Sequence, residues 1–200
     1  MAKQLIISIS REFGSGGHAI AELLAKKFEL PLYDRNILDE IAKEKGIETE
    51  HLQGFDEKPR NPLLTRRVRG YSNSMEEAIA EMQFDYIRKK AESGESFVVL
   101  GRCAETVLRG TEGLVTIFVR GDKPCKIERV MERYDLSKSE AVAKMARHDR
   151  HRKSYHNAHS DMKWGDSRGY DLCINSSVLG IEGTADMLTK YIEACAASKE

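Results

Sequence analysis

The start of the chain combines three features that together restrict its fold: an apolar run, a glycine-rich loop and an amphipathic helix. Residues 4–10 read QLIISIS, which is typical of a buried strand, and apolar residues then recur at helical spacing from Ile20 to Phe28. Between them lies REFGSGGH, residues 11–18. Glycine lets backbone N–H groups turn toward a ligand, and a helix N-terminus adds partial positive charge. This order predicts an anion site between a strand and a helix. A tight turn that binds nothing is the alternative.

The loop departs from the usual phosphate-binding pattern at the position that normally carries a charge. In GxxxxGK[ST] the lysine reaches the phosphates and the hydroxyl holds magnesium. Here Gly17 stands at the lysine position and His18 at the hydroxyl position. We expect Arg11, at the first position, to supply the missing charge, and His18 either to donate to a phosphate or to be an ordinary exposed histidine. The residues predicted to hold the phosphates are Arg11, Gly14, Ser15, Gly16, Gly17 and His18.

Strands and helices alternate along the rest of the chain. Apolar runs at 30–33, 96–101, 114–119 and 170–175 are typical of strands, with helical patterns between them. This alternation predicts an α/β fold with a parallel sheet, helices on both faces and right-handed crossovers. A length of 200 residues suits a single domain over residues 1–200.

Arginine follows four of the five predicted strands. The residues are Arg11, Arg35, Arg102 and Arg120. In parallel sheets ligands lie at the carboxyl ends of the strands, so these arginines predict an anionic ligand there. Solvated loop charge is the alternative.

A basic run, RHDRHRK at 147–153, follows a predicted helix that opens with a capping box at 137–140. Arg147 and Arg150 share one helix face, whereas Arg152 points elsewhere. A continuous helix would not aim all three arginines inward, so we expect fraying or a bend there. A solvated helix end is the alternative.

Several stretches together resemble a known family. They are ISISREFGSGG, LPLYDR, GRCAETVL, the R-x-D-R-x-R run, WGDSRGYDLCINSS and LGIE. They make the chain similar to the bacterial cytidylate kinase-like family, itself similar to the P-loop nucleoside monophosphate kinases. The resemblance implies a three-layer α/β/α P-loop fold with a five-stranded parallel sheet in the order 2-3-1-4-5. It also implies an acceptor-binding segment near residues 35–95 and an arginine-bearing helical lid near residues 145–169.

Two positions differ from true cytidylate kinases. These enzymes carry a GSGKGT-like loop and a Gly-Arg-Asp after the third strand, whose Arg and Asp touch the nucleotide. Here the second motif reads Gly101-Arg102-Cys103, which keeps the arginine and lacks the carboxylate that suits an amino group on a base. Trp164-Gly165-Asp166 is a family motif to which we assign no mechanism; Trp164 could simply pin its segment against the core.

The acceptor is expected to meet Asp34, Arg35 and Arg102, because they follow the second and third predicted strands. Asp34 is also the best carboxylate for Mg²⁺, which takes oxygen ligands. A cap for the helix from Asn36 is the ordinary interpretation of Asp34. The histidines near the basic run lack partners at a recognised spacing, so zinc is not expected.

Composition argues against several classes of protein. Lys plus Arg equal Asp plus Glu at 32 each, which argues against a general nucleic-acid binder. No apolar run is long enough for a membrane span or an export signal, so we expect a cytoplasmic protein with reduced cysteines. Its oligomeric state stays open.

These observations predict a phosphotransferase that uses ATP and Mg²⁺ to phosphorylate a small acceptor, such as the nucleoside monophosphate CMP. Arg11, Arg147, Arg150 and Arg152 would neutralise the transferring phosphoryl group. A nucleotide- or anion-binding sensor with negligible turnover is the second hypothesis, supported by the missing lysine and carboxylate. A scaffolding protein is the third.

Overall fold

Five parallel strands form the central sheet of the computed structural model. The model describes residues 4–34, 36–45, 67–68, 71–72 and 75–197. The sheet has the order β2-β5-β1-β6-β7, which confirms the predicted order 2-3-1-4-5. Its strands are β1 (Ile6–Arg11), β2 (Leu32–Tyr33), β5 (Phe97–Leu100), β6 (Leu114–Arg120) and β7 (Leu172–Asn175).

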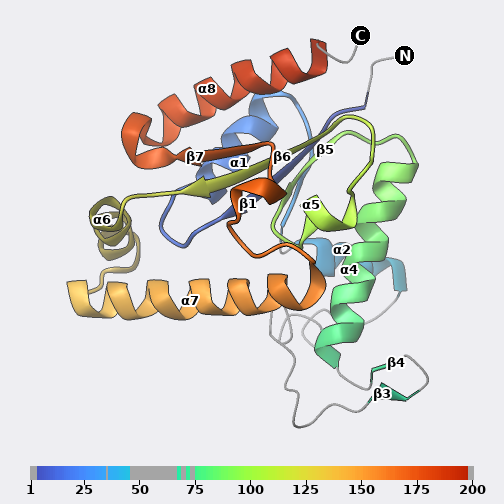
Figure 1. Cartoon of the computed structure of the whole chain (residues 1–200), viewed down its shortest axis with the longest axis horizontal. Helices are drawn as coiled ribbons and strands as arrows, with labels where there is room; N and C mark the ends of the chain where they lie inside the picture. Colours follow the sequence, from blue (N-terminus) through green and yellow to red (C-terminus); the bar gives the residue numbers. More distant parts are fainter. Residues whose placement is uncertain (1–3, 35, 46–66, 69–70, 73–74, 198–200) are drawn as a thin grey trace.

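Helices connect these strands and cover both faces of the sheet (Figure 1). They are α1 (Gly17–Lys27), α2 (Asn36–Lys45), α4 (Met75–Glu92), α5 (Ala104–Val107), α6 (Lys123–Tyr134), α7 (Lys138–His159) and α8 (Ser176–Ala197). A short 3-10 turn, η1 (Ser167–Gly169), precedes β7, and β3 (Arg67–Val68) pairs with β4 (Tyr71–Ser72) in a separate two-stranded sheet. None of the helices among the described residues has the length and apolar character needed to cross a membrane.

Alternate residues of the strands pack into two separate cores. Ile6 and Phe97 face α2, α4 and α5, whereas Ile7, Ile9 and Val98 face α1 and α8. All five side chains are fully buried. A parallel sheet covered on both faces needs such continuously apolar strands, which is why the sequence shows runs of Ile, Val and Leu rather than alternation. The predicted three-layer α/β/α fold is confirmed.

Helix α7 crosses the carboxyl-end side of β1 and β5. The His148 ring stacks on Phe13, just after β1, with ring centroids 4.3 Å apart. Farther along α7, the His159 ring meets the edge of Phe84 on α4. The helix that contains the basic run therefore lies over the strand ends where the sequence predicts a ligand.

The bend or fraying expected at the basic run is wrong, because α7 continues as a helix from Lys138 to His159. Buried Ala141, Met145, Tyr155 and His156 recur along one face of α7, and residues 148, 149 and 152 fall on the same stripe. The helix therefore keeps apolar contacts only if it remains continuous through the arginines. The predicted capping box is present, with Ser137 and Glu140 bonded to one another's backbone N–H.

Candidate active site

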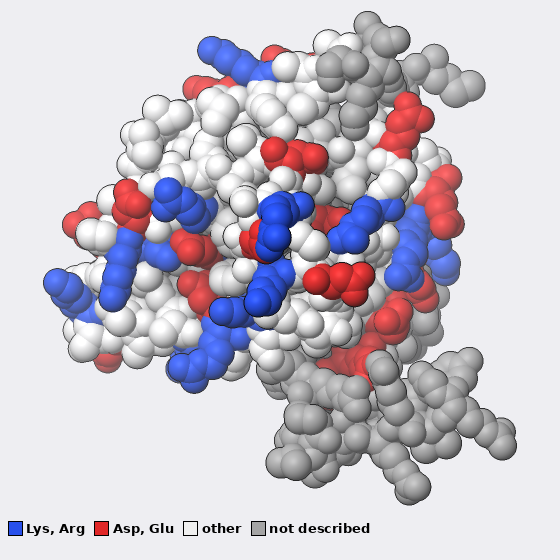
Figure 2. All heavy atoms as spheres, viewed as in Figure 1, with Lys and Arg blue, Asp and Glu red and all other residues white. Residues whose placement is uncertain are grey.

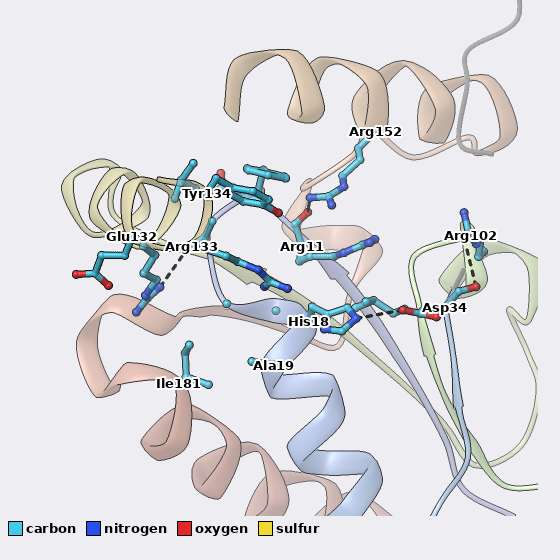
Figure 3. Close-up of a pocket in the computed structure, with 18 residues that line it drawn as sticks. Arg11, His18, Ala19, Asp34, Arg102, Glu132, Arg133, Tyr134, Arg152 and Ile181 are labelled. Carbon is cyan, nitrogen blue, oxygen red and sulfur yellow. Dashed lines mark hydrogen bonds and ion pairs between the residues drawn. The ribbon is translucent and has the colours of Figure 1, made fainter. Parts of the chain in front are cut away.

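A cleft of about 570 Å³ runs along the glycine loop from α6 to the ends of β2 and β5 (Figure 3). Its walls come from the loop and from the ends of several elements rather than from one of them. The lining residues are Arg11, Glu12, Phe13, Gly14, Gly16, Gly17, His18, Ala19, Asp34, Leu100, Arg102, Arg129, Val130, Glu132, Arg133, Tyr134, Arg152 and Ile181. Most of the predicted phosphate-binding and acceptor-binding residues thus meet in one cleft.

Two glycines of the loop adopt backbone conformations that other residues rarely adopt. Gly14 has φ 80° and Gly16 has φ 81°. A Cβ at Gly14 would lie 2.9 Å from Val130 Cγ2, and one at Gly16 would lie 2.8 Å from Ile181 Cγ1. The loop therefore packs too closely against its neighbours for side chains at these positions.

The first turn of α1 presents backbone N–H groups at the cleft. The N–H of Ile20 donates to the carbonyl of Gly16 at 3.0 Å, so the preceding N–H groups have no carbonyl one turn earlier in the helix. Gly17, His18 and Ala19 line the cleft at this turn. The geometry is that of an anion site at a helix N-terminus.

Arg11 and Gly17 occupy adjoining space. A Cβ placed on Gly17 would lie 2.5 Å from Arg11 Cβ and 2.9 Å from Arg11 Cγ. A lysine at position 17 cannot coexist with this arginine, because its Cβ would overlap the arginine stem. Figure 3 shows the Arg11 side chain above the start of α1, pointing along the cleft toward the side of Asp34 and Arg102. The absence of a lysine at position 17 and the presence of an arginine at position 11 thus follow from the same close packing.

Neighbouring side chains fix the shape of the loop. Glu12 Oε2 accepts from Lys126 Nζ at 2.8 Å and from the N–H of Gly121 at 3.1 Å. Arg129 Nη1 donates to the carbonyl of Ser15 at 3.2 Å and to Ser176 Oγ at 3.2 Å. Glu12 is therefore held by the ends of β6 and α6, and Arg129 ties the loop to the start of α8.

The α6 wall of the cleft was not predicted from the sequence. Arg129, Glu132, Arg133 and Tyr134 line it, yet none belongs to a recognisable motif. The only signal available was the helical spacing of Arg129 and Arg133, which any exposed basic helix face would also show.

His18 and Asp34 form a polar pair between α1 and the end of β2. His18 Nε2 lies 3.1 Å from Asp34 Oδ2, and His18 Nδ1 lies 3.4 Å from Glu22 Oε2. The hydrogen bond to Asp34 raises the pKa of His18, although burial opposes the shift. The same bond lowers the pKa of Asp34 to about 2. Both pKa shifts favour the charged form of each partner.

Asp34 does not fit a protein-held magnesium site. Its Oδ2 lies on His18, and its Oδ1 accepts from the N–H of Asn36 at 3.2 Å, so the predicted helix-cap contact is present. A protonated imidazole at this distance repels a dication. Among the residues that the structure describes, no group of three or more His, Cys, Asp or Glu could hold a metal ion.

Arg102 lies at the other end of the cleft in an unusual backbone turn. Gly101, Arg102 and Cys103 have φ of 81°, 59° and 51° in succession. Such conformations are uncommon for residues other than glycine, and they cluster at functional sites. Arg102 is only 2% exposed, and its Nη2 donates to the carbonyl of Asp34 at 3.2 Å. Cys103 packs instead into an apolar cluster with Phe84 and Tyr155. Arg35 lies outside the described residues.

The three arginines of the basic run have different surroundings. Arg152 lines the cleft, and its Nη1 donates to the carbonyl of Arg11 at 3.4 Å (Figure 3). Arg147 and Arg150 are exposed and do not line it. Figure 2 shows basic side chains, with acidic ones among them, on the face of the molecule that carries α7. The structure therefore brings one of the three arginines to the loop.

Asp149 gives α7 a second contact with the loop. Its Oδ1 accepts from the N–H of Phe13 at 2.7 Å. Burial raises the pKa of Asp149, while the bond from Phe13 opposes the shift.

A smaller hollow of about 20 Å³ lies between the ends of β1 and β5 and helix α7. It shares three arginines with the main cleft. Its lining residues are Ser10, Arg11, Gly101, Arg102, Cys103, Arg152, Tyr155, His156 and Trp164. The Trp164 ring also packs edge-on against Phe118 at 5.4 Å, which fits the pinning role considered for the Trp164-Gly165-Asp166 motif.

The five-stranded order, the glycine loop between β1 and α1 and the cleft at the strand ends define a P-loop kinase fold. The chain belongs to the cytidylate kinase-like family, whose model matches residues 6–178. A cytidylate kinase of Pyrococcus horikoshii is 28% identical over 194 residues, covering 95% of this chain and 89% of the relative. A cytidylate kinase of Methanococcus aeolicus is 25% identical over 193 residues, covering 94% and 97%.

Solved structures share the architecture. An uncharacterized protein from Eubacterium ventriosum is 40% identical and superposes with a TM-score of 0.76, covering 95% of this chain and 99% of its own. A shikimate kinase from Bacteroides thetaiotaomicron superposes with a TM-score of 0.55 at 13% identity, covering 94% and 98%. The second likeness concerns the fold alone.

Proposed function

We propose that the protein transfers the γ-phosphoryl group of ATP to a small anionic acceptor, with nucleoside monophosphates such as CMP as the first candidates. The observation that carries the proposal is the position of Arg11. The stem of its side chain fills the space beside Gly17, the position at which the P-loop pattern has a lysine, and the side chain lies above the start of α1 (Figure 3). Arg11 would therefore supply a cation to the phosphates although the motif lacks the lysine.

The donor phosphates would lie on the first turn of α1. Backbone N–H groups of Gly16, His18 and Ala19 would bind them, assisted by the helix N-terminus, whereas the Gly17 N–H donates to Ser15 Oγ at 3.4 Å. Arg11 would contact the β- and γ-phosphates, and a protonated His18 would add charge from the other side. The donor base would lie toward α6, where Arg133 and Ile181 line the cleft.

The acceptor would lie at the opposite end, between Arg102, Arg152 and Asp34. Three guanidinium groups line both the cleft and the small hollow, counting Arg11. Three cations at this end favour an acceptor that is itself negatively charged, because each of them attracts an anion. The relatives named cytidylate kinases support CMP, whereas the missing carboxylate at Cys103 makes other monophosphates worth testing.

Phosphoryl transfer depends mostly on positioning and on neutralising charge on the transferred oxygens. Arg11 would do this from the loop and Arg152 from α7. Mg²⁺ would supply further charge neutralisation when it accompanies ATP; we assign it no ligand in the chain, because Asp34 is engaged by His18 and Asn36. Arg147 and Arg150 would act only if α7 moved, because both are exposed here.

A nucleotide- or anion-binding sensor is the second candidate function. The engagement of Asp34 by His18 and Asn36 favours it, because Asp34 is the carboxylate that the sequence predicted for magnesium. A sensor would bind ATP and turn over none of the acceptors.

Purified protein incubated with Mg-ATP and CMP, UMP, AMP, GMP or dCMP distinguishes the two. We expect turnover above background with at least one acceptor, and a loss of about 100-fold or more in Arg11→Ala. Arg150→Ala is the matched control and should stay within about twofold, because surface substitutions have small effects. ATP binding without turnover on any acceptor would favour the sensor.

A further inference from the structure

A buried pair of side chains joins the two elements that carry the acceptor-side arginines. Glu105 lies on α5 and His156 lies on α7, and Glu105 Oε1 is 2.7 Å from His156 Nε2. Their exposed fractions are 6% and 4%. Ser10 Oγ donates to the other carboxylate oxygen at 3.3 Å. Burying such groups is costly unless they are paired, and the proposed reaction makes no direct use of them.

Each member of the pair lies close in sequence to an arginine of the small hollow. Arg102 precedes Glu105 in the left-handed turn that leads into α5. Arg152 lies one helical turn before His156 on α7, so the two side chains share a face of that helix. The bond between Glu105 and His156 thus fixes the separation of the backbones that carry the two arginines.

Arg152 also lies between two anchors of α7. On one side Asp149 accepts from the N–H of Phe13 in the loop, at 2.7 Å. On the other side His156 contacts Glu105. Loss of the second anchor should change the distance between α5 and α7 at Arg152. The first anchor still holds the helix to the glycine loop, and Thr106 Oγ1 and Ser160 Oγ, 2.8 Å apart, still join α5 to the end of α7.

We propose that Glu105 and His156 are positioning residues that set the spacing of Arg102 and Arg152 around one oxyanion of the acceptor. The inference rests on the proposed function in identifying that oxyanion as part of an acceptor. The arginine spacing itself does not depend on turnover. The ligand is a phosphate monoester or free phosphate that lies in the main cleft and directs one oxygen toward the hollow, whose volume of about 20 Å³ admits no larger group.

Phosphate binding followed by NMR tests this inference at separate sites of one protein. Inorganic phosphate is titrated into ¹⁵N-labelled protein, and a parallel titration uses CMP. The signals followed at the hollow are the Nε–H groups of Arg102 and Arg152 and the indole N–H of Trp164. Backbone N–H signals of Gly16 and His18 report the glycine loop in the same sample.

Three variants separate positioning from general stability. Glu105→Gln keeps an oxygen that accepts from His156 and should stay within about threefold of the wild-type affinity at the hollow. The double variant Glu105→Met with His156→Phe replaces the pair by apolar side chains, which avoids a buried unpaired charge and favours folding. His159→Gln is the matched control, because it changes a histidine on the same helix that contacts Phe84 and does not line the hollow.

In the double variant we expect phosphate and CMP to bind the hollow at least tenfold more weakly, with the glycine-loop signals titrating as in the wild type. Equal weakening at both sites would mean a general loosening and would overturn the inference. Unchanged phosphate affinity in the double variant would also overturn it, as would an equally large loss of affinity in His159→Gln. The absence of any signal change at the hollow in the wild type would overturn it too. Absence of turnover in the kinase assay, with this pattern of binding intact, would refute the proposed function and leave the positioning role standing.

Discussion

Arg11 and Gly17 exclude a second side chain between them: a Cβ on Gly17 would lie 2.5 Å from the Cβ of Arg11. The arginine at the end of β1 therefore requires a glycine at the start of α1. The P-loop pattern has its lysine at the start of α1. In this chain a cation, Arg11, lies at the end of β1, and the lysine position holds Gly17. This contact links the unusual sequence to the proposed chemistry.

Gly16→Ala should reduce both stability and ATP affinity. The substitution places a Cβ 2.8 Å from Ile181 Cγ1 at φ 81°, so overpacking of roughly 1–3 kcal/mol adds to the backbone strain. Gly110→Ala is the matched control: φ is 86° and a Cβ there would meet nothing within 4 Å. Chemical denaturation and calorimetry with ATP measure the two effects. Equal results for both variants would show that backbone strain alone, and not the packed loop, is responsible.

Arg152→Ala should raise the KM for the acceptor by about 10- to 100-fold, because hydrogen bonds to charged groups contribute roughly 1.5–3 kcal/mol each. The KM for ATP should change less, since the glycine loop holds the donor. Arg147→Ala on the same helix is exposed and serves as the control. Steady-state kinetics with each substrate varied in turn gives both constants. A larger effect at Arg147 than at Arg152 would mean that α7 is repositioned during the reaction.

Some of this arrangement could be predicted from the sequence, and some could not. The strand order and the loop follow from apolar runs and glycines, which depend on local residue types. The direction of Arg147, Arg150 and Arg152 depends on whether α7 stays helical, and buried Met145 and Tyr155 on either side of the run decide that. The sequence alone does not show which face of α7 is buried.

The buried contact between Glu105 and His156 was missed for a similar reason. Glu105 lies in the GRCAETVL stretch and His156 follows it 51 residues later, so their 2.7 Å contact emerges only from the fold. Asp34 shows the opposite case. Its place at a strand end was evident, whereas its bond to His18 was not, and that bond decides whether Asp34 is available to a metal ion.

Asp34→Asn should lower the pKa of His18, because the hydrogen bond to Asp34 is the largest cause of its upward shift. A raised pKa keeps His18 charged above its ordinary value of 6.5, so its contribution to phosphate binding is complete below that pH and is lost as the pH rises through the folded pKa. As the pH rises, the loss of ATP affinity should therefore begin at a lower pH in the variant than in the wild type. NMR titration of the His18 ring measures the pKa directly. An unchanged ring pKa in Asp34→Asn would refute this account of the pair.

Stability should fall as the pH drops from about 6.5 to about 4, in part through His148. Burial, the largest cause, and Arg152, Lys144, Arg147 and His151 lower the pKa of His148 to about 4 in the folded protein. The unfolded chain takes up the proton first, near 6.5, so over this window it binds more protons than the folded state does.

His148→Phe keeps a ring on Phe13 and cannot be protonated, so it should reduce the slope of unfolding free energy against pH in that window. The control is His151→Phe, since residue 151 is exposed. Urea unfolding at several pH values measures the slopes. Equal slopes for wild type and His148→Phe would exclude His148 as a source of the acid sensitivity.

The most direct test of the substituted cation is a double-mutant cycle at positions 11 and 17, measured as turnover of Mg-ATP with the best acceptor. Arg11→Gly removes the guanidinium, and Gly17→Lys forces a side chain into the Arg11 stem, so each single change should cost about 100-fold or more. The double variant restores the GxxxxGK pattern in the space that Arg11 vacates, and it should regain at least tenfold over Arg11→Gly. Full turnover in Arg11→Gly, or a double variant no better than Arg11→Gly, would contradict the account.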